Sequence, residues 1–195
     1  MARKTTTPDF PSDQQVFKAL FDRIAEKGLG KARLSDLATQ FNVPLVDFYA
    51  AYPSVQSIID QFLNYIDQQM IKSAVLDSES DKRDVYFDLL MNRFDTLQEH
   101  RDGVKRWLSD MSKQPLLWAG LLKRWDKSLS LMLDIAKDSP VFPIKKIGLA
   151  GIYLNGLREW TKDDSEDLSK TMVSIDKSLT KAQDFTQKYL TKKVA

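Results

Sequence analysis

The sequence predicts an all-α protein of about nine helices, and three observations support this fold class. Glycine and proline number only 7 each among the 195 residues, fewer than the roughly 7% and 5% of an average chain, which disfavours turn-rich sandwiches and barrels. Apolar residues recur at steps of three and four over most of the chain, which is the period of an amphipathic helix. No segment has the pattern of a strand bounded by turn residues.

The composition argues against an enzyme. The chain has no cysteine, which excludes disulfide scaffolds, thiolate nucleophiles and cysteine-based metal sites. His100 is the only histidine, so multi-histidine metal sites are excluded and a catalytic triad would have to be built around this one ring. We therefore expect no catalytic residues, no metal site and no cofactor.

The N-terminus and the charge give further expectations. Residues 1–13 lack the apolar segment of a signal peptide, and no apolar run approaches the roughly 20 residues needed to span a bilayer. We therefore expect a cytoplasmic protein without a transmembrane segment. The net charge of +2 is too close to balance to indicate a nucleic-acid or membrane partner by itself.

Capping and turn residues define the first helices. Residues 1–11 are expected to form a flexible arm. Ser12 and Gln15 have the spacing of a capping box, and the helix that they begin ends at Gly28. A short second helix ends near Asn42, because asparagine tolerates a left-handed backbone.

Prolines and a polar loop bound the remaining helices. Pro44 begins a third helix over 44–51, which Pro53 closes, and Ser54 caps a fourth that runs to about residue 75. After a polar loop, the apolar periodicity predicts five more helices, at about 82–98, 102–111, 115–137, 143–161 and 165–190.

The second and third helices, separated by a tight turn, have the pattern of a helix-turn-helix, a module that places its last helix in the major groove of DNA. This part of the chain resembles the DNA-binding motif of the TetR family in three stretches: Leu37-Ala38, Phe41-Asn42-Val43 and Phe48-Tyr49-x-x-Tyr52-Pro53-Ser54. The resemblance covers residues 14–62 in detail, and the helix plan covers nearly the whole chain.

The resemblance implies a set of DNA contacts. Arg3 and Lys4 are candidates for an arm in the minor groove. The candidates within the motif are Lys31, Arg33, Ser35, Pro44, Leu45, Tyr49 and Tyr52. Tyr49 and Tyr52 also fit a second interpretation, in which they close the small core between the first and third helices.

The charge of this region keeps an alternative open. Residues 1–66 contain seven Lys or Arg and seven Asp or Glu, whereas DNA-binding domains are usually basic. The third helix has no Lys or Arg but contains Asp47. Where the family usually has His and Lys, this chain has Ala51 and Val55. These features favour a TetR-like protein that has lost operator recognition.

The helices expected between 82 and 137 are rich in Leu, Met and Trp. In TetR-like proteins this region encloses a small-molecule pocket, and large flexible or flat side chains can line an apolar cavity. The candidate ligand-binding residues are Met91, Phe94, Trp107, Met111, Trp118, Leu121, Leu122 and Trp125. The alternative is that these residues form a solid core.

The last two helices carry small residues and an apolar stripe. The TetR resemblance implies that they pair with their symmetry mates in a four-helix bundle, which makes the protein a homodimer. The candidate interface residues are Gly151, Leu154, Leu168, Met172, Ile175 and Leu179. The alternative is that the stripe packs only on its own chain.

A second resemblance lies between Leu149 and Asp176. This stretch, with Trp160-x-x-Asp163-x-Ser165-x-Asp167, is similar to the C-terminal part of the lipid-binding accessory protein family of ubiquinone biosynthesis, which is itself TetR-like. The same acidic cluster also fits an ordinary capped helix start.

These observations lead to one main expectation and one alternative. We expect a TetR-like transcriptional regulator with an arm at 1–11, a helix-turn-helix domain at 12–66, and a ligand-binding and dimerisation domain at 67–195. It would bind DNA as a dimer under the control of an apolar small molecule. The alternative is a TetR-fold lipid-binding accessory protein that no longer binds DNA.

Overall fold

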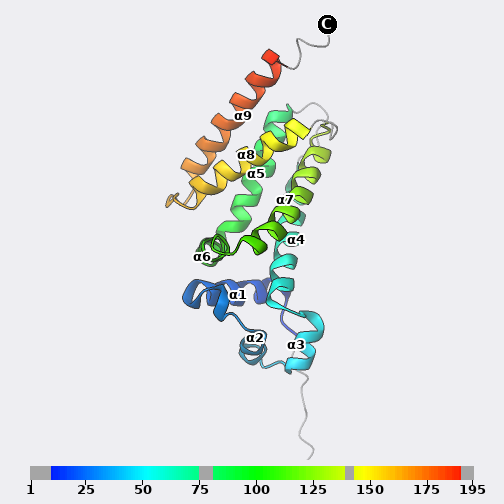
Figure 1. Cartoon of the computed structure of the whole chain (residues 1–195), viewed down its shortest axis with the longest axis vertical. Helices are drawn as coiled ribbons and strands as arrows, with labels where there is room; N and C mark the ends of the chain where they lie inside the picture. The colour runs from blue at the N-terminus through cyan, green and yellow to red at the C-terminus, as the bar shows by residue number, and fades with distance from the viewer. Residues whose placement is uncertain (1–9, 75–80, 139–142, 190–195) are drawn as a thin grey trace, which may run out of the picture. The chain divides into compact units, whose positions relative to one another are not determined.

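A computed structural model of the chain describes residues 10–74, 81–138 and 143–189. Over these residues it contains nine α-helices, one 3₁₀ turn and no strand, which confirms the all-α class (Figure 1). Among the described helices, none combines the length and the apolar character needed to cross a membrane. The elements are α1 (Asp13–Lys27), η1 (Leu29–Lys31), α2 (Leu34–Gln40), α3 (Leu45–Ala51), α4 (Val55–Ser73), α5 (Lys82–Gln98), α6 (Arg101–Met111), α7 (Pro115–Ile135), α8 (Pro143–Trp160) and α9 (Ser169–Tyr189).

The chain divides into two compact units. The first unit comprises Met1–Tyr65 and Glu99–Pro115, and the second comprises Ile66–Gln98 and Leu116–Ala195. The sequence-based division assigned everything after residue 66 to one domain. The structure differs in that α6 belongs to the first unit.

The packing of α6 against α1 explains this difference. A Cβ atom on Gly103 would lie 2.3 Å from the carbonyl oxygen of Phe21, so only glycine permits this approach. The buried indole of Trp107 stands edge-on to the Phe21 ring, with centroids 6.4 Å apart. Asp110 accepts a hydrogen bond of 2.8 Å from the backbone amide of Leu29, and this bond lowers the pKa of Asp110. The core of the first unit is therefore completed by a helix from later in the chain.

The start of α1 follows the sequence-based expectation. The Ser12 amide donates to Oε1 of Gln15 at 2.8 Å, and the Gln15 amide donates to Oγ of Ser12 at 3.4 Å. This capping box satisfies backbone donors that have no partner within the helix. From it, α1 directs its apolar face into the first unit, burying Val16, Phe17, Ala19, Leu20, Phe21 and Ile24.

In the second unit, α5, α8 and α9 pack closely around Gly156. A Cβ atom at this position would meet Phe94 and Ile175 at 3.1 Å, which is tighter than ordinary van der Waals contact. The fully buried Trp160 donates its indole N–H to Oε1 of Gln98 at 3.0 Å. These contacts join the three helices into one core.

A buried ionic cluster joins α4, α5 and α7 within the second unit. Asp67 pairs with the guanidinium of Arg93, whose side chain is 1% exposed, and with that of Arg124 at 2.6 Å. Ser128 donates its hydroxyl to the same carboxylate at 3.1 Å. Arg93 also lies over the ring of Tyr153, 5.3 Å from its centroid. The single carboxylate of Asp67 thus forms ion pairs with two guanidinium groups.

The acidic stretch before α9 forms a turn, and the helix begins at Ser169 instead of near residue 165. Asp163 is fully buried and accepts hydrogen bonds from the backbone amide and the hydroxyl of Thr171, both at 2.8 Å. Leu168 has a φ of 54°, in the left-handed region, which breaks the helical path just before the first turn of α9.

Candidate nucleic-acid interface and apolar cavity

The helix-turn-helix is formed by α2, the turn at 41–44 and α3. Asn42 has a φ of 54°, so the left-handed conformation falls on the expected residue. The amide of Val43 donates to the carbonyl of Ala38 at 2.9 Å and closes the turn. Phe48 is fully buried and stacks against Phe41 at a centroid distance of 6.5 Å. These contacts anchor one face of α3 and leave its opposite face in solvent.

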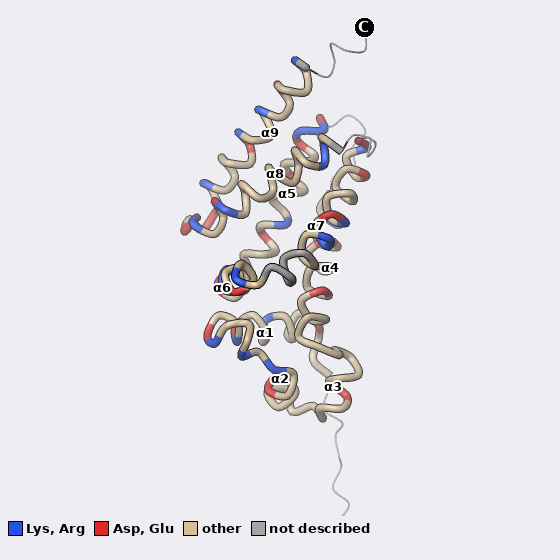
Figure 2. The backbone as a smooth tube through the Cα atoms, viewed as in Figure 1, with Lys and Arg blue, Asp and Glu red and all other residues tan. Residues whose placement is uncertain are grey.

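The exposed face of α3 is mostly apolar. Leu45, Val46 and Tyr49 are 50%, 73% and 57% exposed. Pro44 and Asp47 are exposed beside them. Figure 2 accordingly shows α3 in tan and red, with no blue along its length. A large apolar surface held out into water in this way is suited to contact with a partner.

Tyr52 is a correction to the predicted DNA contacts. Its side chain is 2% exposed, and its hydroxyl donates to Oδ1 of Asp13 at 2.5 Å. Burial raises the pKa of Tyr52, and the hydrogen bond to Asp13 raises it further. Its ring packs between Phe10 and Phe48, at 6.3 and 5.2 Å between centroids. Tyr52 therefore closes the core and cannot contact a phosphate.

The basic and polar candidates differ in their availability. Three of them are exposed around the start of α2: Lys31, Arg33 and Ser35. Arg23, which lies nearby, is instead paired with Asp36 at 3.0 Å. The predicted arm residues Arg3 and Lys4 lie outside the described residues.

The predicted ligand-binding residues do not gather at one site. Trp107 and Met111 are buried in the first unit. Leu122 is 53% exposed, and the side chain of Trp118 lies outside the described part. The remaining four are core residues of the second unit: Met91, Phe94, Leu121 and Trp125. The prediction of one pocket lined by all eight is therefore wrong, because the six buried residues belong to two separate cores.

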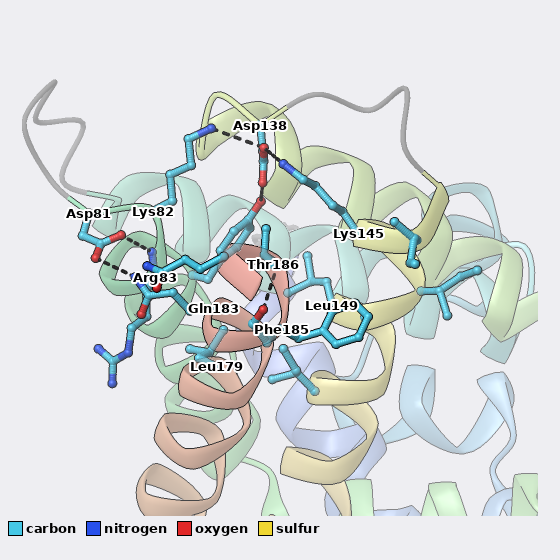
Figure 3. Close-up of a pocket in the computed structure, with 17 residues that line it drawn as sticks. Asp81, Lys82, Arg83, Asp138, Lys145, Leu149, Leu179, Gln183, Phe185 and Thr186 are labelled. Atoms are coloured by element: carbon cyan, nitrogen blue, oxygen red, sulfur yellow. Dashed lines mark hydrogen bonds and ion pairs between the residues drawn. The ribbon is translucent and has the colours of Figure 1, made fainter. Parts of the chain in front are cut away.

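The second unit instead contains a cavity of about 610 Å³, formed by the start of α5, the start of α8 and the end of α9 (Figure 3). None of the eight predicted ligand-binding residues lines it. Its apolar side chains are Ile144, Ile147, Leu149, Ile152, Leu179 and Phe185.

A cluster of charges lies at one edge of this cavity. Lys82 and Lys145 reach Asp138 from opposite sides (Figure 3), at 3.2 and 2.5 Å. Tyr86 donates its hydroxyl to the same carboxylate at 3.0 Å. Burial alone would raise the pKa of Asp138, but the hydrogen bonds from Lys145, Tyr86 and Lys82 outweigh it and lower that pKa. Asp138 is thus held ionised between two ammonium groups.

Sequence reasoning missed this cavity for a physical reason. Its lining comes from the ends of three helices, and the periodicity of a helix shows which face is apolar but not which helix ends converge. The small residues of this region include Gly148, and a small residue on a helix usually indicates close approach of a neighbouring helix. At this position, however, a Cβ atom would meet nothing within 4 Å, so the glycine borders open space.

Comparisons with known proteins identify the architecture. No known protein family and no curated protein matches the chain. The crystal structure of a TetR transcriptional regulator from Nitrosomonas europaea ATCC 19718 is similar with a TM-score of 0.76, covering 89% of this chain and 99% of that one at 19% identity. Our chain of 195 residues therefore has the TetR fold. A TetR regulator from Rhodococcus sp. RHA1 is similar with a TM-score of 0.62, over 86% of this chain and 92% of that one at 13% identity.

The identities in these comparisons are low, so what they show is the TetR fold. Both named structures are of transcriptional regulators. The expected similarity of residues 149–176 to the lipid-binding accessory family is not shown by them. In the TetR fold of this chain, Asp163 of that stretch holds the turn before α9 through its bonds to Thr171.

The predicted dimer residues lie on α8, on α9 and, in the case of Leu168, just before α9, and they fall into two groups. Leu154 and Met172 are 44% and 41% exposed, and Gly151 is also exposed. The others are buried within their own chain and cannot reach a partner: Leu168, Ile175 and Leu179. The prediction is corrected for these three. They were chosen for their helical spacing, and that spacing proves to mark the side of α9 that faces its own core.

Proposed function

We propose that this protein is a dimeric DNA-binding regulator in which α3 enters the major groove. The observation that carries the proposal is the exposed face of α3, held in a helix-turn-helix by the buried Phe48. The overall similarity to TetR regulators supports it at the level of the fold.

The exposed residues suggest how each DNA contact is made. Lys31, Arg33 and Ser35 are suited to bind phosphates and so to position α3, and the Tyr49 hydroxyl can do the same. Leu45 and Val46, near the start of α3, are suited to apolar contact with the methyl groups of thymine. Because α3 has no Lys or Arg, the bidentate contact with guanine that these residues commonly make is not offered by this helix.

The second unit offers a surface for pairing two copies. Gly151, Leu154, Met172 and the adjacent Val173 expose apolar area on α8 and α9. A Cβ atom on Gly151 would meet nothing within 4 Å, so a partner helix can approach closely there. A two-fold axis at this surface would present two copies of α3 at a fixed spacing, as a palindromic site requires.

A small molecule can control the binding of DNA if it favours one separation of the two α3 helices in the dimer. A ligand shifts such an equilibrium only by its differential affinity for the two states. The ligand proposed here is apolar, in line with the cavity of the second unit.

The test is binding of the purified dimer to genomic DNA fragments as a function of salt. If each protomer neutralises two to four phosphates, the slope of log affinity against log salt is about −4 to −7. A discrete footprint with such a slope supports the proposal. Absence of any retardation at low salt contradicts it.

A matched pair of variants separates a specific interface from general charge effects. Val46→Glu places a carboxylate on the exposed face of α3, whereas Ser109→Glu adds the same charge at an exposed position of α6 in the same unit. We expect the first to weaken binding at least about tenfold and the second to change it less than about threefold. Equal losses in the two variants would refute the assignment of α3.

A further inference from the structure

The cavity of the second unit is not used by the DNA interface. Its volume of about 610 Å³ lies within the range of roughly 300–1,000 Å³ that small-molecule sites occupy. Apolar side chains from α8 and α9 line one part of its wall, among them Ile152, Leu179 and Phe185. In Figure 3, Leu149, Leu179 and Phe185 lie on one side of the cavity, and the cluster around Asp138 lies at its edge.

Three cations line the cavity in the part of the chain that the structure describes, and each is paired with a carboxylate. Lys82 and Lys145 share the carboxylate of Asp138. Arg83 pairs with Asp176 of α9 and also with Asp84, its neighbour on α5, at 2.6 Å. Among the described residues that line this cavity, no cation is therefore left to neutralise a charged ligand.

This pairing determines the chemistry of the occupant. A carboxylate or phosphate would have to displace Asp138 or Asp176, or else enter an apolar site without a counter-ion, and burying an unpaired charge is costly. An uncharged apolar molecule gains about 25 cal/mol for each Å² of apolar surface removed from water and breaks no ion pair. We propose that this cavity binds a neutral, predominantly apolar small molecule. This inference deepens the ligand part of the proposed function, and only the role of the molecule as an effector rests on that function.

Two glycines of the second unit provide a matched pair of variants. Gly148 of α8 lines the cavity, whereas Gly120 of α7 does not. In both cases an added Cβ atom would meet nothing within 4 Å, so neither position opposes a larger side chain. Gly148→Leu therefore fills the site, whereas Gly120→Leu makes the same change at a position that belongs neither to the cavity nor to the surface proposed for pairing.

The experiment titrates the full-length protein with two fluorescent probes, N-phenyl-1-naphthylamine and its 8-sulfonate, which share one aromatic framework and differ by a single anionic sulfonate group. We expect the neutral probe to bind at least about tenfold more tightly than the anionic one. Gly148→Leu should weaken binding of the neutral probe at least about tenfold, and Gly120→Leu should change it less than about threefold. Circular dichroism and sedimentation of each variant establish its folding and its oligomeric state.

Three results would overturn the inference. The first is equal or tighter binding of the sulfonate, and the second is unchanged binding of the neutral probe in Gly148→Leu. The third is an equal loss of neutral-probe binding in Gly120→Leu, which would show that the loss in Gly148→Leu is not specific to the cavity. Since no DNA is present, these outcomes are independent of whether the protein binds an operator.

Discussion

Replacing Asp67 by asparagine is expected to destabilise the second unit strongly. Asp67 is the carboxylate that both Arg93 and Arg124 contact, and the side chains of the three residues are 9%, 1% and 14% exposed. Asparagine keeps the size of the side chain but removes its charge, which leaves two guanidinium groups near each other in a poorly hydrated site.

The magnitude follows from the burial of the cluster. Removing one partner of a buried ion pair costs about 3–5 kcal/mol, because the remaining charge stays buried without compensation. For a chain of this size, with an unfolding entropy of about 2.1 cal/mol/K per residue, this corresponds to a fall in Tm of about 7–12 °C. The exposed Asp60 lies on the same helix, and Asp60→Asn should change stability by less than about 0.5 kcal/mol.

Thermal and urea unfolding followed by circular dichroism measure both variants. A second substitution sharpens the test: adding Arg93→Met to Asp67→Asn removes one of the two uncompensated cations and should recover part of the loss. If Asp67→Asn stays within about 1 kcal/mol of the parent protein, or if the added Arg93→Met lowers stability further, the cluster is not an electrostatic unit.

Three further predictions concern the DNA contact, the helix packing and the pH dependence. Replacing a contacted thymine by deoxyuridine in a selected site removes only a methyl group and should weaken binding about fourfold, from about 0.8 kcal/mol per buried carbon; unchanged affinity at every thymine would exclude apolar readout by Leu45 and Val46. Gly103→Ala should destabilise the first unit by about 1–3 kcal/mol or more, because its Cβ would overlap Phe21, whereas Gly151→Ala should stabilise by about 0.5–1 kcal/mol; unfolding curves that rank the two the other way would contradict the packing of α6. Asp163 is held ionised because hydrogen bonds from Ser165 and Thr171 outweigh its burial and lower its pKa. The Asp163 carboxylate stabilises the fold above its unfolded pKa of about 3.9, and this contribution is lost as the pH falls below that value. When the pH is lowered from about 5 to 2, the parent protein should therefore lose more stability than Asp163→Asn, which has no carboxylate at this position to protonate. Identical pH profiles of the two proteins would refute this role.

Local features of the sequence predicted local structure well. The capping box of Ser12 and Gln15 and the left-handed Asn42 were both expected from residue type and spacing, and each depends only on neighbours in the chain. The same reasoning led to the all-α class and the helix-turn-helix.

Features that depend on distant segments were not predictable in this way. The periodicity of α9 marks an apolar stripe, but it does not say whether Ile175 and Leu179 face their own chain or a partner. Trp107 was assigned to a ligand pocket because of its residue type, and its true environment depends on Phe21, more than eighty positions earlier. The cavity is defined by the ends of three helices, which no single stretch of sequence reveals.

The return of α6 into the first unit determines how the chain can be divided. The polypeptide passes from one unit to the other at 65–66, again at 98–99 and again at 115–116. A fragment cut after residue 66 would keep α2 and α3 but lose the indole of Trp107 and expose the face of Phe21 that Gly103 covers. The N-terminal third of the chain is therefore not a module that can be transplanted or duplicated by itself. A graft of the first unit onto another TetR-fold scaffold has to include α6.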